Sequence, residues 1–371
     1  MKKRVVVVGF GDTGMLVAIN LGSDVDIIGI SPKPCLVSGQ ELGLRLTQAG
    51  SWRRDYLVPF HRYKKLDHVT IHQGLVSAID SNKQCVVFSD ADGHTQQLDY
   101  DVLVLSPGVT NGFWRQNNIE DLATIKQDIA SKASQLDGAN TIAIIGGGAT
   151  GVSVANNLAQ RSANKLVHLF YSASQPLPGY HPKVRDSIER HLIRAGVVMH
   201  ANHRAIIPAD FNCDAMTTTP VEWAGGQTAF KADVSLWAVG KMKPNNGGIP
   251  SQMLDANGFI KADDFLRVPG HDNIFTVGDI AASDTNRSSA RNKGYRVVAG
   301  NIKAYLTDSP DEMKKYRAPH YRWGSILGVQ NNGLLIYQAD GSKFRFPRWS
   351  IRTVLFPLLV RKMIYQGMRK S

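Results

Sequence analysis

The chain has 371 residues, of which 43% are hydrophobic, and its formal net charge is +12. That length and apolar content are enough for two or three domain cores, which excludes an extended disordered chain. The three cysteines, Cys35, Cys85 and Cys213, are far apart and show neither C-x-x-C nor metal-ligand spacing. We therefore expect reduced thiols in a reducing compartment, and we assign no metal site.

The chain begins with a predicted strand, Val5 to Val8, that runs into the glycine-rich turn Gly9-Phe10-Gly11-Asp12-Thr13-Gly14 and then into a helical pattern. In such a turn the first glycine makes the bend, the second lets backbone N–H groups approach a pyrophosphate, and the third lets helix and strand pack closely. The phosphates then bind at the N-terminus of the helix. The short apolar run has no small-residue cleavage site, so we expect a cytoplasmic protein rather than a secreted one.

The next elements continue an α/β pattern. Residues 25–31 predict the second strand of a βαβ unit, and residues 69–76 and 84–88 alternate as strands of a sheet do. Residues 100–108 predict a buried strand that ends in a tight turn, and residues 123–136 predict a helix.

A second glycine-rich turn, Gly146-Gly147-Gly148-Ala149-Thr150-Gly151, follows the apolar run Ile142 to Ile145. One G-x-G-x-x-G turn is weak evidence for a nucleotide site, because glycine-rich turns are common. Two copies, each followed by a helical pattern, indicate two nucleotides, one flavin and one nicotinamide.

The rest of the chain completes the second unit and returns to the first. We expect strands at 167–171, 197–201 and 232–240 with a helix at 184–195, and then a strand at 273–279 that ends on Gly278-Asp279. Short aromatic and basic strands and a final helix follow from about residue 314.

In this order, the motifs G-x-G-x-x-G, Tyr100-Asp101-x-Leu-Val-Leu-x-x-Gly108, the second G-x-G-x-x-G, Ala232-Asp233-x-x-x-Trp-Ala-x-Gly240 and Asn273-Ile274-x-x-x-Gly-Asp resemble those of the two-dinucleotide-binding flavoprotein oxidoreductases. The chain is most similar to the branch with apoptosis-inducing-factor-like and ferroptosis-suppressor-like proteins and type II NADH dehydrogenases. The resemblance implies an α/β fold with two Rossmann-like domains: a discontinuous FAD domain at 1–110 and 250–313, an inserted NAD(P)H domain at 111–249, and a small α+β C-terminal region at 314–371.

The resemblance also implies the cofactor-binding residues. Asp279 would hydrogen-bond the ribityl chain of FAD and open a helix that faces the flavin, although a plain helix cap is its alternative. Arg45 would contact FAD, with a solvated helix charge as the alternative, and Val76 would contact the adenine end by its backbone. The expected residues are Gly9, Gly11, Gly14, Ser31, Arg45, Val76, Gly108, Gly278 and Asp279 for FAD, and Gly146, Gly148, Gly151 and Gly240 for NAD(P)H.

Such an arrangement passes a hydride from nicotinamide C4 to flavin N5 and then electrons to an acceptor, with no protein nucleophile. The cysteine pairs that disulfide reductases and sulfide:quinone reductases of this kind need are missing, so a quinone is the leading acceptor. One alternative is a soluble reductase of a small acidic electron-transfer protein. The other is a flavin-bound redox sensor with little turnover, which is suggested by Asp12 in the first turn, by Ser31 where a ribose-binding carboxylate is typical, and by Ser153 where quinone-reducing relatives carry glutamate.

The C-terminal segment is basic and aromatic, with no Asp or Glu after Asp340. This composition favours peripheral attachment to an anionic membrane, while docking of the last helix on the protein is the alternative. The uncharged run Thr353 to Val360 is far shorter than the ~20 residues that a spanning helix needs. The basic segment at 52–65 lacks a nucleic-acid-binding module, so we expect no nucleic-acid partner, and a homodimer is left open.

Overall fold

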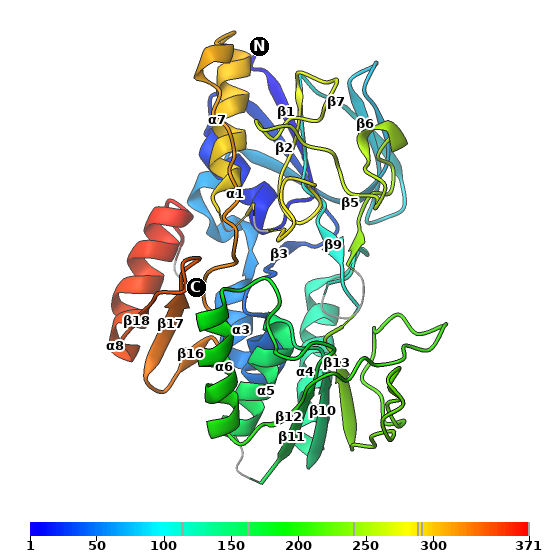
Figure 1. Cartoon of the computed structure of the whole chain (residues 1–371). Helices are drawn as coiled ribbons and strands as arrows, with labels where there is room; N and C mark the ends of the chain where they lie inside the picture. Colours follow the sequence, from blue (N-terminus) through cyan, green and yellow to red (C-terminus); the bar gives the residue numbers. More distant parts are fainter. Residues whose placement is uncertain (113–114, 162–163, 240–241, 288, 291, 370–371) are drawn as a thin grey trace.

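The computed structural model describes residues 1–112, 115–161, 164–239, 242–287, 289–290 and 292–369. Its described part contains two separate parallel-strand units, one at each end of an elongated molecule (Figure 1). The predicted α/β fold with two Rossmann-like units is therefore confirmed.

The first unit is built on a sheet with the strand order β15-β8-β1-β2-β5-β6-β7. The residues of β1 alternate between its two faces: Val5 and Val7 enter the core under helices α1 and α7, while Val6 and Val8 enter the core on the opposite face. Both faces are apolar because a parallel sheet is covered on both sides. The elements are β1 (Arg4–Val8), β2 (Asp26–Ser31), β5 (Val69–Asp80), β6 (Cys85–Asp90), β7 (Thr95–Asp99), β8 (Val102–Leu105), β15 (Ile274–Thr276), α1 (Asp12–Leu21) and α7 (Gly294–Leu306).

The second unit repeats this design on the smaller sheet β12-β11-β10-β13. Ile142 and Ile144 of β10 enter the core under the helices, whereas Ala143 and Ile145 enter the core on the other face. The elements are β10 (Thr141–Ile145), β11 (Leu166–Phe170), β12 (Val198–His200), β13 (Val234–Trp237), α4 (Leu122–Gly138), α5 (Ala149–Arg161) and α6 (Pro182–Arg194).

Two features join the units. The short strands β9 (Val109–Thr110) and β14 (Lys243–Pro244) pair antiparallel where the chain passes between them. Helix α2 (Leu42–Thr47) packs against α5, where a Cβ added to Gly43 would lie 2.3 Å from the Cβ of Ser153. Helix α3 (Ala49–Tyr56) follows α2, and the strands before and after the two helices, β3 (Cys35–Val37) and β4 (Leu57–Pro59), pair antiparallel.

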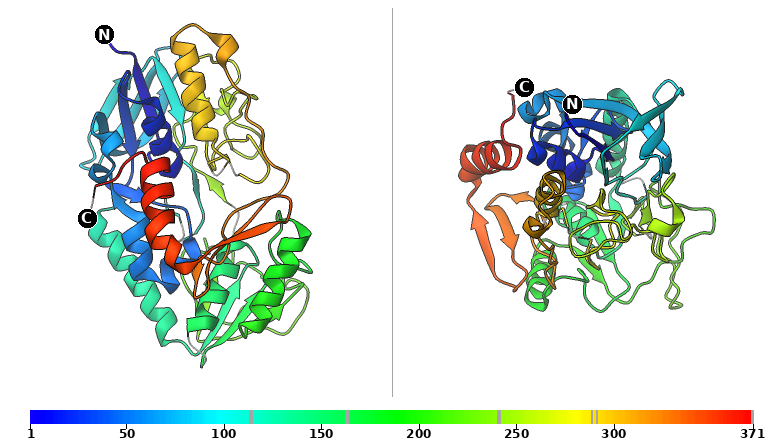
Figure 2. Two further views of the ribbon diagram at one scale, coloured as in Figure 1. Left: turned by 90° about the vertical axis from the view of Figure 1, so that its left-hand side faces the viewer. Right: turned by 90° about the horizontal axis from the view of Figure 1, so that it is seen from above.

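The C-terminal part forms a small sheet and a helix at the periphery of the molecule (Figure 2). Its elements are β16 (Val329–Gln330), β17 (Gly333–Tyr337), β18 (Lys343–Phe346), α8 (Arg348–Ser350) and the π-type helix η5 (Ile351–Ile364). Short 3-10 turns are η1 (Phe60–Arg62), η2 (Lys64–Leu66), η3 (Ser251–Met253) and η4 (Pro310–Glu312). Among the described residues we find no helix that is both long and apolar enough to cross a bilayer.

One expected element is wrong. Gly278 and Asp279 form a turn rather than the start of a helix, and the next helix, α7, begins only at Gly294. The turn arises because Gly278 has a φ of +95° and its N–H donates to Ser289 Oγ (2.9 Å), which folds the chain back before the helix can begin.

A stack of aromatic and imidazole rings covers one face of the second sheet. The ring of Phe170 lies between His200, at a centroid distance of 4.1 Å, and Trp223, at 4.5 Å. His168 Nδ1 and His200 Nε2 are 2.9 Å apart and share a hydrogen bond. Burial, together with the neighbouring His168 and His203, lowers the pKa of His200 to about 4.

This stack predicts acid sensitivity of the second unit. Between about pH 4 and pH 6.5 the unfolded chain binds a proton at His200 that the folded chain does not, so stability should fall as the pH drops through this window. We expect urea unfolding at pH 7 and pH 5 to show a smaller loss of stability for His200→Phe than for the wild type. The exposed His61 is the control, and an equal loss in His200→Phe and His61→Gln would contradict the assignment.

Candidate functional site

The first glycine-rich turn has three glycines in three different environments. A Cβ added to Gly9 would lie 2.3 Å from the carbonyl oxygen of Ser106, and one added to Gly14 would lie 2.2 Å from the carbonyl oxygen of Gly9. A Cβ added to Gly11 would meet nothing within 4 Å. Gly9 and Gly14 are therefore required by backbone packing, while Gly11 borders open space.

The second turn repeats this pattern position by position. Gly146, at a φ of +127°, approaches the carbonyl oxygen of Ala238, and Gly151 approaches the carbonyl oxygen of Gly146 at 2.0 Å from its ideal Cβ. Gly148 again borders open space. We call the two glycine-rich turns, residues 9–14 and 146–151, cradles. They have the same construction although they lie on different sheets.

The open space fits a phosphate group. Gly11 is the N-cap of α1 and makes no side-chain capping bond, so the first N–H groups of the helix lack that partner. Unpaired helix N–H groups beside an open, side-chain-free position can bind the pyrophosphate of a dinucleotide. The residues present therefore fit FAD at the first turn and NAD(P)H at the second, and the individual binding roles stay predictions.

The turn after β15 brings Asp279 to the start of α1. A Cβ added to Gly278 would lie 3.2 Å from Thr13 Oγ1. The side chain of Asp279 is about one quarter exposed and forms an ion pair with Arg115 Nη1. The predicted ribityl-binding carboxylate thus lies at the expected cradle, and it is paired with a cation that the sequence analysis did not single out.

Asp12, the first residue of α1, is hydrogen-bonded to the loop of Ser38 and Gly39. Its carboxylate accepts hydrogen bonds from Ser38 Oγ (2.8 Å) and from the backbone N–H of Gly39 (2.7 Å). Burial raises the pKa of Asp12, and these two bonds and the charge of Arg115 oppose that rise. Asp12 therefore fixes the loop beside the cradle.

At the end of β2, Ser31 is buried and its Oγ accepts the backbone N–H of Lys33 (3.2 Å). A glutamate from another part of the chain contacts the residues that follow Ser31. Glu120 forms an ion pair with Lys33, and its backbone N–H donates to the carbonyl oxygen of Pro32 (3.3 Å). No sequence motif pointed to Glu120, because it lies far from Ser31 along the chain.

Arg45 is only 8% exposed, so the alternative of a solvated helix charge is wrong. It lies on α2, 3.8 Å from Asp128 of α4, with its guanidinium 5.5 Å from the centroid of the Trp52 ring. Burial lowers the pKa of Arg45, and the charges of Asp128 and Glu120 counteract this effect. Arg45 thus bridges the first unit and helix α4.

The remaining predicted residues are placed as follows. Val76 lies at a bulge of β5, three residues beyond Gln73, which pairs with Ser31 at the end of β2. Gly108 has a φ of +72° and accepts a hydrogen bond from the N–H of Asn245 (3.1 Å). Gly240 lies outside the described residues.

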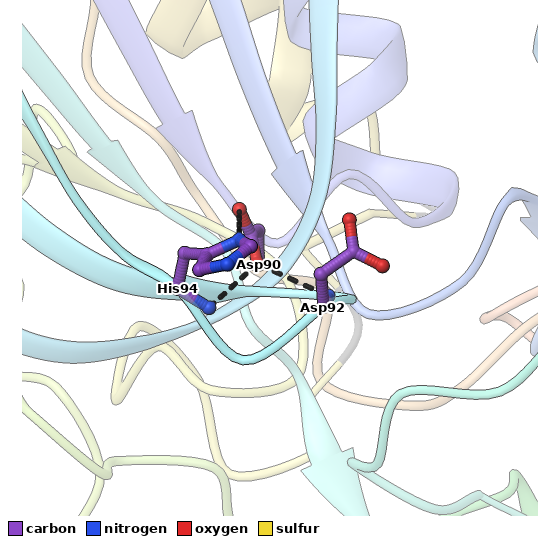
Figure 3. Close-up of side chains that lie close together, drawn as sticks. All are labelled: Asp90, Asp92 and His94. Carbon is purple, nitrogen blue, oxygen red and sulfur yellow. Dashed lines mark hydrogen bonds and ion pairs between the residues drawn. The ribbon is translucent and has the colours of Figure 1, made fainter.

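The cysteines and one cluster of acidic and histidine side chains are further candidates for reactive or metal-binding groups. Cys35, Cys85 and Cys213 are buried free thiols, and burial raises the pKa of Cys35 to about 11. Asp90, Asp92 and His94 lie within 4.8 Å of one another on the hairpin between β6 and β7 (Figure 3). Asp90 Oδ1 accepts the backbone N–H groups of Asp92 (3.0 Å) and His94 (2.8 Å), so this cluster is a turn held by its own hydrogen bonds.

Comparisons with known proteins agree with this geometry. The sequence pattern of the pyridine nucleotide-disulphide oxidoreductases matches residues 3–300. Ferroptosis suppressor protein 1 of Taeniopygia guttata is 25% identical over 65% of this chain and 65% of its own length. The type II NADH:quinone oxidoreductase Ndh of Mycobacterium tuberculosis is 25% identical over 72% of this chain and 64% of its own length. The chain thus spans just under two thirds of these two relatives.

Among solved structures, the sulfide:quinone oxidoreductase of Aquifex aeolicus superposes with a TM-score of 0.71 at 17% identity. The match covers 100% of this chain and 93% of that one. At this identity the similarity is one of fold.

The two open glycines predict separable binding defects. Gly11→Ala and Gly148→Ala meet no neighbouring atom, so both variants should fold with nearly wild-type stability. A methyl group at the phosphate position should weaken FAD binding in the first variant and NAD(P)H binding in the second by about tenfold. Fluorescence titration with each nucleotide measures this.

The matched control is Gly14→Ala, whose methyl group would collide with a backbone oxygen and should lower the melting temperature. Wild-type affinity for both nucleotides in Gly11→Ala and Gly148→Ala would contradict the phosphate assignment.

Proposed function

Because this chain belongs to the pyridine nucleotide-disulphide oxidoreductase family, we propose that it transfers electrons from NAD(P)H through FAD to a quinone at a membrane surface. The predicted oxidoreductase activity and the predicted cofactors, FAD and NAD(P)H, are confirmed by the family match. The quinone and the membrane surface are the parts that we add.

The observation that carries the proposal is the presence of two complete dinucleotide cradles in one chain. FAD, when bound, accepts a hydride from a nicotinamide and releases electrons to an acceptor. The protein's own contribution is to orient both nucleotides and to supply electrostatics. The glycine cradles would hold the phosphates, and Asp279 would offer a carboxylate beside the first of them.

Quinone is favoured over thiol-based acceptors for two reasons. The three buried cysteines offer no exposed pair for disulfide or sulfide chemistry, and burial keeps the pKa of Cys35 near 11, which opposes thiolate formation. A relative of similar sequence is named as a type II NADH:quinone oxidoreductase.

The C-terminal helix supports contact with a bilayer. One side of it packs on the protein: Tyr365 is buried, and Val360 and Ile364 contact the core around α1 and α7. The other side exposes Leu358 by 46% and Met363 by 59%. Thus the docking alternative and the membrane alternative describe opposite sides of the same helix.

Two further apolar side chains of the C-terminal part are exposed: Trp349 of α8 by 70% and Phe344 of β18 by 45%. Exposed basic residues are neighbours of these apolar residues in the sequence, namely Lys343, Arg345, Arg348, Arg352 and Lys362. Apolar groups within a basic surface match an anionic lipid interface.

A soluble reductase of an acidic electron-transfer protein is the second candidate. The net charge of +12 favours it, because a positive surface steers an acidic partner. The buried Ser153, which packs against Gly43 where the quinone-reducing branches carry glutamate, also fits a changed acceptor.

The first experiment follows the flavin absorbance of the purified protein without oxygen. We expect NADH or NADPH to bleach the visible flavin band and a short-chain quinone to restore it. A bound flavin that neither nucleotide reduces would contradict the enzyme, and reduction without reoxidation by quinone would contradict only the acceptor.

The exposed apolar side chains predict a membrane-binding defect. Replacing Trp349, Leu358 and Met363 by serine should lower binding to anionic liposomes more than tenfold, since each buried apolar side chain contributes about 1.5–3 kcal/mol. Quinone turnover on liposomes should fall, while reduction of a soluble dye should be kept.

The matched control is Ile193→Ser with Leu166→Ser, two exposed apolar residues (57% and 59%) on the second unit. Unchanged liposome binding in the triple variant would argue against the membrane surface and leave the soluble reductase.

A further inference from the structure

Two carboxylates lie close together at the start of α1. Asp12 lies in the first turn, and Asp279 arrives next to it from the end of β15. Burial raises the pKa of Asp12, and the charge of Asp279 contributes to that rise. A dinucleotide pyrophosphate would add a third anionic group at the same helix end, and neighbouring like charges repel.

Arg115 supplies a positive charge beside both carboxylates. Its Nη1 pairs with Asp279, and its Nη2 donates to the carbonyl oxygen of Gly39 at 3.4 Å, the loop residue whose N–H is bonded to Asp12. Gly39 makes room for the guanidinium, because a Cβ there would lie 2.9 Å from Nη2. Arg115 therefore lies between the two carboxylates.

The backbone holds Arg115 in place although it is distant in sequence from α1. The N–H of Asn111, the residue after β9, donates to the carbonyl oxygen of Arg115 (3.0 Å), and the two residues form an antiparallel bridge. The Nε atom is buried and has no hydrogen-bond partner among the described residues. The group thus has an unused donor, and its bond to Gly39 is long.

We propose that Arg115 binds the pyrophosphate of FAD and offsets the charge of Asp12. On FAD binding the guanidinium exchanges the carboxylate of Asp279 for phosphate oxygens, which leaves Asp279 available for the ribityl hydroxyls. A guanidinium suits this exchange because its planar donors match phosphate as well as carboxylate. The inference rests on the FAD site of the proposed enzyme and adds a residue to it.

The test uses the full-length apoprotein and titrates FAD, ADP, riboflavin and adenosine by fluorescence or calorimetry. Arg115→Gln should weaken FAD and ADP binding by about 10- to 100-fold, because a charge-assisted bond to phosphate is lost. Riboflavin and adenosine, which carry no phosphate, should change less than threefold. Asp12→Asn combined with Arg115→Gln should recover at least part of the lost FAD affinity.

Arg194→Gln, at an exposed arginine of α6, is the control and should leave all four affinities unchanged. Equal losses for riboflavin, adenosine and ADP would overturn the proposal and show that Arg115 only holds the loop. Unchanged FAD and ADP affinities in Arg115→Gln would also overturn it. Failure of the wild-type apoprotein to bind FAD would instead overturn the proposed function itself.

Discussion

The contact between the third glycine of each turn and the carbonyl oxygen of the first is the constraint on which the molecule depends. Gly14 meets Gly9, and Gly151 meets Gly146, at separations that leave no room for a side chain. This contact sets how closely each helix lies on its strand and keeps the helix N-terminus open at the strand end. Both proposed nucleotide sites depend on that spacing. The alternating apolar residues of β1 and β10 pack under the helices and help to maintain it.

Electrostatics around the first site comes from parts of the chain that are remote in sequence. Asp12 belongs to the turn, Asp279 follows β15, and Arg115 follows β9. Asp12 and Arg115 both bond to the loop of Ser38 and Gly39, and Arg115 also pairs with Asp279. A similar exchange occurs at the end of β2, where Glu120 lies beside the buried Ser31 through Lys33. At both positions that depart from the usual pattern, charged residues from remote segments therefore lie nearby in space.

Local sequence patterns predict the fold, whereas contacts between remote segments do not appear in them. Glycine spacing and apolar runs are local, so both turns, the strands around them and the two-unit fold were predictable from the residues alone. Arg115 and Glu120 were not, because long-range folding of the segment after β9 brings them to the site and no local pattern marks them. The turn at Gly278 was missed for a related reason: its geometry depends on a bond to Ser289, eleven residues later.

The C-terminal helix is tied to the protein beyond its end as well as before it. After the helix, Arg369 pairs with Asp67, and the N–H of Lys64 donates to the carbonyl oxygen of Gly367 (3.2 Å). Tyr365 packs edge-on against Tyr63 at a centroid distance of 4.9 Å. The helix is thus fixed to the rest of the protein rather than attached only through the chain that precedes it. A lipid surface that engages it would also set the tilt and height of the flavin unit above the headgroups, so every molecule would present the same side to substrates dissolved in the bilayer.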